Sequence, residues 1–294
     1  MSFVILIGVG AFLLMLPFAH NGELTIIDAL FTATSAACVT GLIVKDTPVD
    51  FTSFGHIIIL SLIQIGGLGY MTAVTFLAIM RRKKLGYRDR LILKESLNYP
   101  GMSGIFRFLK IVFASIIIIE LCGALILSLR FWVDMPLGDA VWFGLFHSIS
   151  AFNNAGFSLF SDNMMGFRND LVINITIPLL VIIGGLGYMV LLELYNYRKK
   201  SLTRISTHTK LVLWSSGILI IVGMAIILSL EWNNPESLGN MSSWEKILAA
   251  WFASINYRTA GFNTIDFSTF NDSDLFFGTV FMITGGSPGG TAGG

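Results

Sequence analysis

Long apolar stretches separated by short polar connections run through the whole chain. Five of them reach or approach the roughly 20 residues that a membrane-spanning helix needs, and they cover residues 2–19, 54–80, 111–129, 171–195 and 211–230. A sixth stretch begins near Leu275 and breaks into the glycine-rich run GGSPGGTAGG. The pattern predicts an all-α polytopic membrane protein.

The connections after the first, third and fifth stretches are partly apolar and resemble one another. Residues 28–44, 144–160 and 250–266 each begin with a helix-favouring stretch that is too short to span a membrane. Each then reaches a glycine followed by a large apolar residue, and these glycines are Gly41, Gly156 and Gly261. This internal repeat predicts a unit of outer helix, short helix, glycine loop and inner helix, present three times.

Composition supports a membrane protein and removes other classes. Hydrophobic residues make up 54% of the 294 residues, charged residues only 13%, and the mean hydropathy is +0.75. A soluble domain carries about 25% charged residues, so a soluble enzyme and a disordered chain are both disfavoured. The net charge of +1 gives no support for nucleic-acid binding. Two distant cysteines, Cys38 and Cys122, predict neither a disulfide framework nor a metal site.

Basic residues concentrate in two connections, which indicates the orientation. Segments 81–110 and 197–210 hold 14 of the 19 Lys and Arg residues, and the other connections are acidic. By the positive-inside rule these two linkers are cytoplasmic, and the glycine loops lie near the extracellular side of a multi-pass cell-membrane protein. The repeats are then expected at 1–80, 111–196 and 211–294. The basic linkers additionally suit the docking of a cytoplasmic partner.

The chemistry of the three glycine loops favours a cation filter. Loop backbone at membrane depth is tolerated where it is buried in protein or lines a wet path, and a helix C-terminus that points toward such a path favours a cation. No carboxylate lies within the loop cores, so backbone carbonyls are the natural ligands for an ion such as K⁺. The alternative is that each glycine only makes a tight turn. The candidate filter residues are Cys38, Val39, Thr40, Gly41, Asn153, Asn154, Ala155, Gly156, Arg258, Thr259, Ala260 and Gly261.

The inner stretches differ from one another in their glycine content. Residues 65–71 read IGGLGYM, and the same letters return at 183–189, where small residues predict close helix packing. The third inner stretch cannot continue as a helix through so many glycines and a proline. We interpret it as a gate below the filter, with a frayed chain end as the alternative. The gating-loop residues are Gly285, Gly286, Ser287, Pro288, Gly289, Gly290, Thr291, Ala292, Gly293 and Gly294.

These motifs together resemble the Trk/Ktr/HKT superfamily of potassium transporters, and most closely its bacterial Ktr/Trk branch. CVTGL, NNAGF and RTAGFNT are similar to its first three filter segments, and GGSPGGTAGG is similar to the start of its gating loop. The resemblance implies K⁺ as the transported ion, which Gly41 supports, and Na⁺ as a coupling or activating ion. It also implies a homodimer in the lipid membrane that is regulated by a separate cytoplasmic nucleotide-binding subunit.

The family has four repeats, whereas this sequence has about 2.5 to 3, so we expect the chain to be a fragment that stops within the third repeat. Two charged residues need separate consideration. Glu120 lies inside an apolar stretch, where an acid is either functional or bonded to a neighbouring helix. Arg258 is expected to brace its loop from behind, through carbonyls or through a carboxylate such as Glu120 or Asp266.

The function expected from the sequence is potassium uptake through a filter that the glycine-rich loop gates. The alternative is a secondary transporter of another small cation or solute, built from broken helices. That alternative is disfavoured because all three glycine loops lie on the same side. An enzyme is not expected, because the apolar stretches contain no cluster of nucleophile, base or metal ligands.

Overall fold

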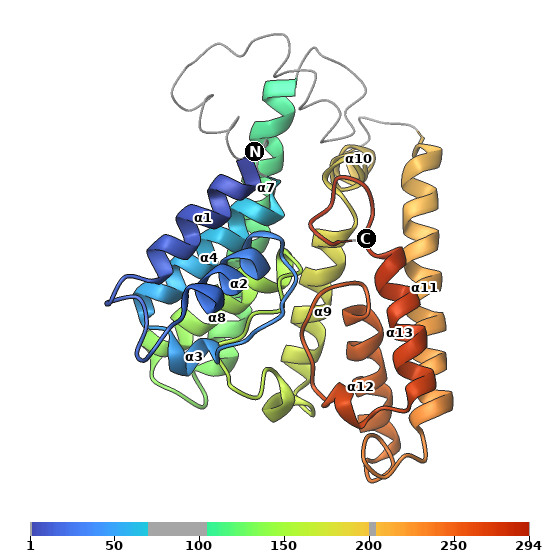
Figure 1. Cartoon of the computed structure of the whole chain (residues 1–294). Helices are drawn as coiled ribbons and strands as arrows, with labels where there is room; N and C mark the ends of the chain where they lie inside the picture. Colours follow the sequence, from blue (N-terminus) through green and yellow to red (C-terminus); the bar gives the residue numbers. More distant parts are fainter. Residues whose placement is uncertain (1, 70–104, 200–203, 294) are drawn as a thin grey trace.

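The computed structural model describes residues 2–69, 105–199 and 204–293 (Figure 1). Within these ranges the regular structure is helical, and one isolated β-bridge joins His20 to Phe51. Two helical segments, Leu109–Phe131 and Thr207–Glu231, are each long and apolar enough to cross a membrane. Two further helices, Leu171–Gly185 and Tyr188–Arg198, are long and apolar enough only when taken together, and they meet at a bend of 100°.

The first group contains α1 (Ser2–Leu14), α2 (Ile26–Ala37), α3 (Thr47–Asp50) and α4 (Ser53–Gly67). Its short helix α2 starts at a capping box, in which the side chains of Thr25 and Asp28 each accept a hydrogen bond from the other's backbone N–H. Glycine at position 10 lets α1 approach Leu62 of α4, since a Cβ there would lie 2.7 Å from that side chain.

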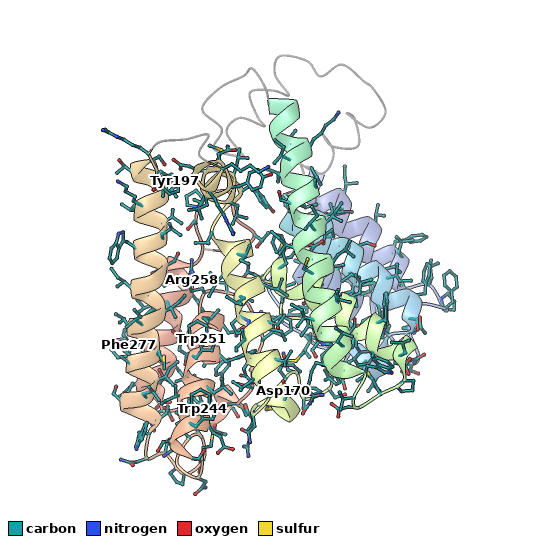
Figure 2. All side chains as sticks on the ribbon, turned by 180° about the vertical axis from the view of Figure 1, so that it is seen from behind. Asp170, Tyr197, Trp244, Trp251, Arg258 and Phe277 are labelled. Carbon is teal, nitrogen blue, oxygen red and sulfur yellow. The ribbon has the colours of Figure 1, made fainter. Side chains whose placement is uncertain are left out.

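The second group contains α7 (Ile105–Phe131), α8 (Leu137–Phe152), the short 3₁₀ helix η1 (Met165–Phe167), α9 (Leu171–Gly185) and α10 (Tyr188–Arg198). Arg130, at the end of α7, forms ion pairs with Asp134 and with Asp170. Asp170, labelled in Figure 2, is also the N-cap of α9 and accepts a hydrogen bond from the Ile173 N–H. One arginine therefore fixes where the outer helix ends and the inner helix begins.

The third group repeats this order with α11 (Thr207–Glu231), α12 (Ser243–Asn256), the short 3₁₀ helix η2 (Phe267–Thr269) and α13 (Asp272–Thr284). Figure 1 shows α1 to α8 packed together on one side, α11 to α13 on the other, and α9 between them. In each group a short helix, α2, α8 or α12, follows the first helix and leads into a loop.

The three groups share their packing and are not independent domains. One buried cluster joins residues of α7 to α9 with Phe252 and Phe262 of the third group. A second cluster joins α1 to α4 with Phe146 and Phe157 of the second group. In a membrane, such contacts stabilise the fold by close packing more than by the removal of water.

The inner stretches end earlier than the apolar pattern predicts. The predicted continuous helix over 171–195 is wrong, because α9 stops at Gly185 and Gly187 has a φ of +90°. The Tyr188 N–H then donates to the Gly289 carbonyl, 3.0 Å away, instead of to its own helix. The predicted helix over 54–80 ends at Gly67, and residues 70–80 lie outside the described part. The first predicted stretch, 2–19, is helical only to Leu14.

Close packing explains the glycines of the two IGGLG motifs. A Cβ at Gly66 would lie 2.0 Å from the Ala37 carbonyl oxygen, and a Cβ at Gly184 would lie 1.8 Å from the Phe152 carbonyl oxygen. Both carbonyls belong to the last residues of short helices. The expectation of close helix packing at these motifs is confirmed. The glycines let the end of a short helix pack directly against an inner helix.

Candidate functional site

The three repeated glycines, far apart in the sequence, meet at one point. A Cβ on Gly41 would lie 2.7 Å from the Ala155 carbonyl oxygen and 3.4 Å from the Gly261 Cα. A Cβ on Gly156 would lie 2.5 Å from the Gly261 Cα. We call this meeting point the glycine junction. The three backbones touch there, and any side chain would have to displace a neighbouring loop.

The backbone conformation at the junction is the same in all three loops. Gly41, Gly156 and Gly261 have φ values of +75°, +69° and +77°. Two residues earlier in each loop lies a non-glycine residue in the left-handed region, with φ of +57°, +57° and +64° at Val39, Asn154 and Thr259. A side chain in this region costs about 1–2 kcal/mol. The repeated strain indicates one functional geometry that is built three times.

Each loop folds back onto the short helix that precedes it. The N–H groups of Thr40 and Ala155 donate to carbonyls five residues earlier, at 2.9 and 2.8 Å. In the third loop the Asn256 side-chain oxygen accepts from the Phe262 N–H at 3.1 Å. These bonds tie the short helices' C-terminal ends to the glycine junction, so the negative ends of three helix dipoles lie at the loops.

In the second loop, polar side chains form a buried network behind the backbone. The Asn153 amide Nδ2 donates to Gln64 Oε1 at 3.0 Å and to Glu120 Oε1 at 3.2 Å. Gln64 Nε2 in turn donates to Glu120 Oε2 at 3.3 Å. Glu120 is therefore bonded to neighbouring helices, which confirms one of the two interpretations of this acid. A second buried residue, His147, bonds the Ser158 hydroxyl and the Leu159 N–H.

In the third loop, Arg258 is buried and bonds a backbone carbonyl. Its Nε donates to the Gly285 carbonyl at 3.4 Å, so the expectation that it bonds carbonyls is confirmed, and no ion pair with Glu120 or Asp266 is present among the described residues. The arginine is closely packed, because only 4% of its surface is exposed. Figure 2 shows Trp244, Trp251 and Arg258 in succession along the third group, with Arg258 nearest the middle of the molecule.

The predicted gating loop lies against the second and third loops. Thr291 is its main anchor, since the Thr291 hydroxyl accepts from Asn154 Nδ2 at 2.7 Å and donates to the Phe152 carbonyl at 2.8 Å. The Thr291 N–H also donates to the Gly184 carbonyl at 3.1 Å. On the other side the Gly293 N–H donates to the Thr259 hydroxyl at 2.9 Å. Gly294 lies outside the described residues.

The structure brings most of the sequence-predicted residues to one place. Cys38 caps α2 and is exposed, Val39 is buried, and the Thr40 hydroxyl donates to Ser35. Ala155 and Ala260 are fully buried next to their glycines. Pro288 and Gly290 contact the break between α9 and α10. Gly286, Ser287 and Ala292 complete the loop, whose Gly286 N–H donates to the Gly293 carbonyl and whose Ser287 N–H donates to the Gly185 carbonyl.

The sequence argument did not single out Gln64 or assign His147 a polar role. Gln64 is the one amide side chain in the apolar stretch 54–80, and an isolated polar residue in such a stretch is a usable signal for a buried network. His147 lies in the middle of a predicted short helix, where packing is the expected role. The hydrogen bonds that His147 makes with Ser158 and Leu159 could not be predicted from spacing, because Ser158 lies 11 residues away.

The available ligands at the junction are backbone and amide oxygens. Within residues 2–69, 105–199 and 204–293, no three His, Cys, Asp or Glu side chains gather in a way that could hold a metal ion. Short helices that lead into irregular loops, surrounded by longer apolar helices, are typical of a helical membrane transport protein.

Comparisons with known proteins place the chain within that class. A model of the TrkH family, described as cation transport proteins, matches residues 1–294, and the chain belongs to this family. It is 41% identical over 293 residues to the Ktr system potassium uptake protein B of Bacillus subtilis and 40% identical over 294 residues to the protein of the same name from Vibrio alginolyticus. Each alignment covers 100% of this chain and 65% of the relative.

A solved structure shows the same fold. The crystal structure of the potassium transporter TrkH from Vibrio parahaemolyticus matches with a TM-score of 0.71 at 20% identity, covering 99% of this chain and 56% of that one. The expected all-α membrane fold and the expected family are confirmed. The chain spans about two-thirds of the length of the curated relatives. It is a membrane-embedded member of a transporter family and not of an enzyme family.

Proposed function

We propose that the protein takes up potassium ions across the cell membrane and that the glycine junction is part of its selectivity filter. The observation that supports this most strongly is the repeated backbone geometry at Gly41, Gly156 and Gly261, where three loops meet. Backbone carbonyls arranged around a centre replace the hydration shell of K⁺. The names of the relatives, potassium uptake proteins, agree with this ion.

The junction also indicates what the conducting state requires. The loops touch at their glycines, so an ion passes only when Gly156 and Gly261 stand further apart. We propose that a fourth filter segment, from protein outside residues 1–294, holds the three loops around the ion. Na⁺ is proposed as a coupling or activating ion, because a relative 36% identical to this chain is named a potassium/sodium uptake protein.

The glycine-rich loop is proposed as the gate. It is anchored on the second loop by Thr291 and on the third by Thr259 and Arg258, and its glycines allow it to move without side-chain clashes. The proposed sidedness puts the glycine junction near the extracellular side and the basic segments 81–110 and 197–210 in the cytoplasm. A homodimer and a separate cytoplasmic nucleotide-binding subunit that docks near those segments are proposed partners.

The test is ion uptake by cells that express the gene in a strain lacking its own potassium uptake. We expect growth at low K⁺ and a clear preference for K⁺ over Na⁺ in flux measurements. Gly41→Ser should lower that preference, because the new side chain meets the Ala155 carbonyl at a position with φ of +75°. Gly8→Ala is the matched control, since nothing lies within 4 Å of Gly8. A preference that is the same in Gly41→Ser would contradict the filter assignment.

A further inference from the structure

We infer that Glu120 is a positioning residue for the second filter loop and that it thereby determines how strongly the filter prefers K⁺ over Na⁺. This inference rests on the proposed function. Glu120 belongs to α7 and is 5% exposed, in a stretch of mostly apolar residues. Glu120 is not itself a candidate filter residue, and it acts through Asn153, which is the C-cap of α8 and the first candidate filter residue of the second loop.

The carboxylate holds Asn153 from behind, with support from a second repeat. Both Glu120 oxygens accept hydrogen bonds, Oε1 from Asn153 and Oε2 from Gln64 of α4. The Ser148 hydroxyl of α8 donates to the Glu120 backbone carbonyl at 2.6 Å. One acid therefore connects α4, α7 and α8, which are the first repeat's inner helix and the second repeat's outer and short helices.

The network controls which groups of the second loop face the cation path. The Asn153 amide donates to Glu120, to Gln64 and to the Ile149 carbonyl. The Asn154 amide is occupied by Thr291. An N–H donor that faced the path would repel a cation, so engaging both amides elsewhere leaves the carbonyls as the groups available to the ion.

Equivalent positions in the three loops show that this role is particular to the second repeat. Counting three residues back from each glycine gives Cys38, Asn153 and Arg258. Cys38 is exposed, and Arg258 donates to the Gly285 carbonyl. Of these three side chains, Asn153 is the one that bonds a buried carboxylate. Because different side chains support the three loops, one acid that lies outside the loops can change the ion preference of a filter that is built from similar segments.

If the contact with Glu120 is lost, the surrounding packing leaves Asn153 little freedom to form another one. A Cβ on Gly67 would lie 2.1 Å from Asn153 Oδ1, and that oxygen has no hydrogen-bond partner. In Glu120→Gln one acceptor oxygen becomes an NH₂ group of nearly the same size, so one of the two donors, on Asn153 or Gln64, faces another donor. An unpaired buried donor is costly, and the loop shifts to relieve it.

The experiment compares Glu120→Gln with Glu231→Gln in proteoliposomes. Glu231 is an equally buried acid whose oxygens accept from Asn271, Asn234 and Ser237, away from the glycine junction. We expect Glu120→Gln to lower the K⁺/Na⁺ permeability ratio by about fivefold or more, Glu120→Asp to restore part of it, and Glu231→Gln to leave it unchanged. Gly67→Ala, which pushes on Asn153 from the other side, should lower the ratio as Glu120→Gln does.

Hydrogen exchange of the peptide covering residues 149–157 provides the second readout. We expect faster exchange in Glu120→Gln than in the wild type or in Glu231→Gln. A permeability ratio that stays at the wild-type value despite faster exchange overturns the specificity role, and unchanged exchange overturns the positioning role. If the wild type itself shows no preference for K⁺, the proposed function fails, while the exchange comparison still decides whether Glu120 holds the loop.

Discussion

At the scale of single residues, the glycine junction explains why this protein places glycine where it does. Gly41, Gly156 and Gly261 combine positive φ with direct backbone contact, so both the conformation and the space require glycine. Glycines elsewhere have a different reason, such as the seating of α8 on α9 at Gly184. A substitution therefore has a cost that depends on which of these roles its glycine serves.

Gly156→Ala tests the junction directly. The methyl group would lie 2.5 Å from the Gly261 Cα in a residue with φ of +69°, and we expect at least about 2 kcal/mol of destabilisation from strain and displacement together. The measurement is thermal unfolding in detergent. Gly217→Ala is the control, because nothing lies within 4 Å of Gly217 in α11 and alanine favours a helix there. Equal melting temperatures for the two variants would argue against the junction.

At the scale of elements, the short helices are defined by their caps. α2 and α12 both begin with a capping box, made by Thr25 with Asp28 and by Ser242 with Glu245. The two acids also lie in the first turn, where the helix dipole favours a negative charge. Well-defined starts matter for these helices, because each must deliver its C-terminal end to the glycine junction at the right depth.

The cap of α2 predicts a pH dependence. Hydrogen bonds from Thr25 lower the pKa of the Asp28 carboxyl below its ordinary value. A lowered folded-state pKa stabilises the fold above the unfolded-state pKa, and this stabilisation is lost as the pH falls through the folded-state pKa. We expect wild type to melt at a higher temperature than Asp28→Asn at neutral pH, and we expect this difference in melting temperature to narrow as the pH falls below the ordinary aspartate pKa of about 3.9.

Circular dichroism in detergent measures both melting temperatures. Thr25→Ala serves as the comparison, since it removes the Thr25 hydroxyl and leaves the backbone N–H and the acid. The pH-dependent gap between this variant and its double mutant with Asp28→Asn should be smaller, because the hydroxyl makes the largest contribution to the lowered pKa. A gap that is constant from neutral to acidic pH would show that the charge of Asp28 does not stabilise α2.

At the scale of the whole molecule, the second repeat links the other two. α4 of the first repeat reaches the second loop through Gln64, and the gating loop of the third repeat reaches it through Thr291. The break between α9 and α10 gives the gating loop its acceptors, Gly184 and Gly185. The proposed filter and the proposed gate therefore share one set of hydrogen bonds, so we expect a change in one to alter the other.

Thr291→Val tests this link. Valine keeps the shape of the side chain and removes the hydroxyl that joins Asn154 to the Phe152 carbonyl. We expect basal K⁺ flux in proteoliposomes to rise severalfold, because each lost buried hydrogen bond weakens the closed position by about 1 kcal/mol. Thr284→Val is the control, since the Thr284 hydroxyl bonds only the Val280 carbonyl within its own helix. Flux that falls in Thr291→Val despite normal membrane insertion would contradict the gate.

The sequence by itself determined the class of protein, the repeated unit and the family. Apolar length, the two basic segments and three glycines in register are local properties, and each depends on only a few neighbouring residues. The same reasoning located the glycine loops and the glycine-rich stretch that is proposed as a gate. It also indicated that Glu120 and Arg258 need polar partners, because a charge among apolar residues cannot be left unpaired.

Only the tertiary structure decided which partners those are. Gln64 and Asn153 are 89 residues apart, and Asn154 and Thr291 are 137 residues apart, so no spacing rule connects them. The end of α9 at Gly185 also depends on a distant segment. The Gly289 carbonyl accepts the hydrogen bond from the Tyr188 N–H, which has no acceptor within the interrupted helix. Hydrogen-bond partners are chosen by how the repeats pack, and that packing is a property of the whole fold.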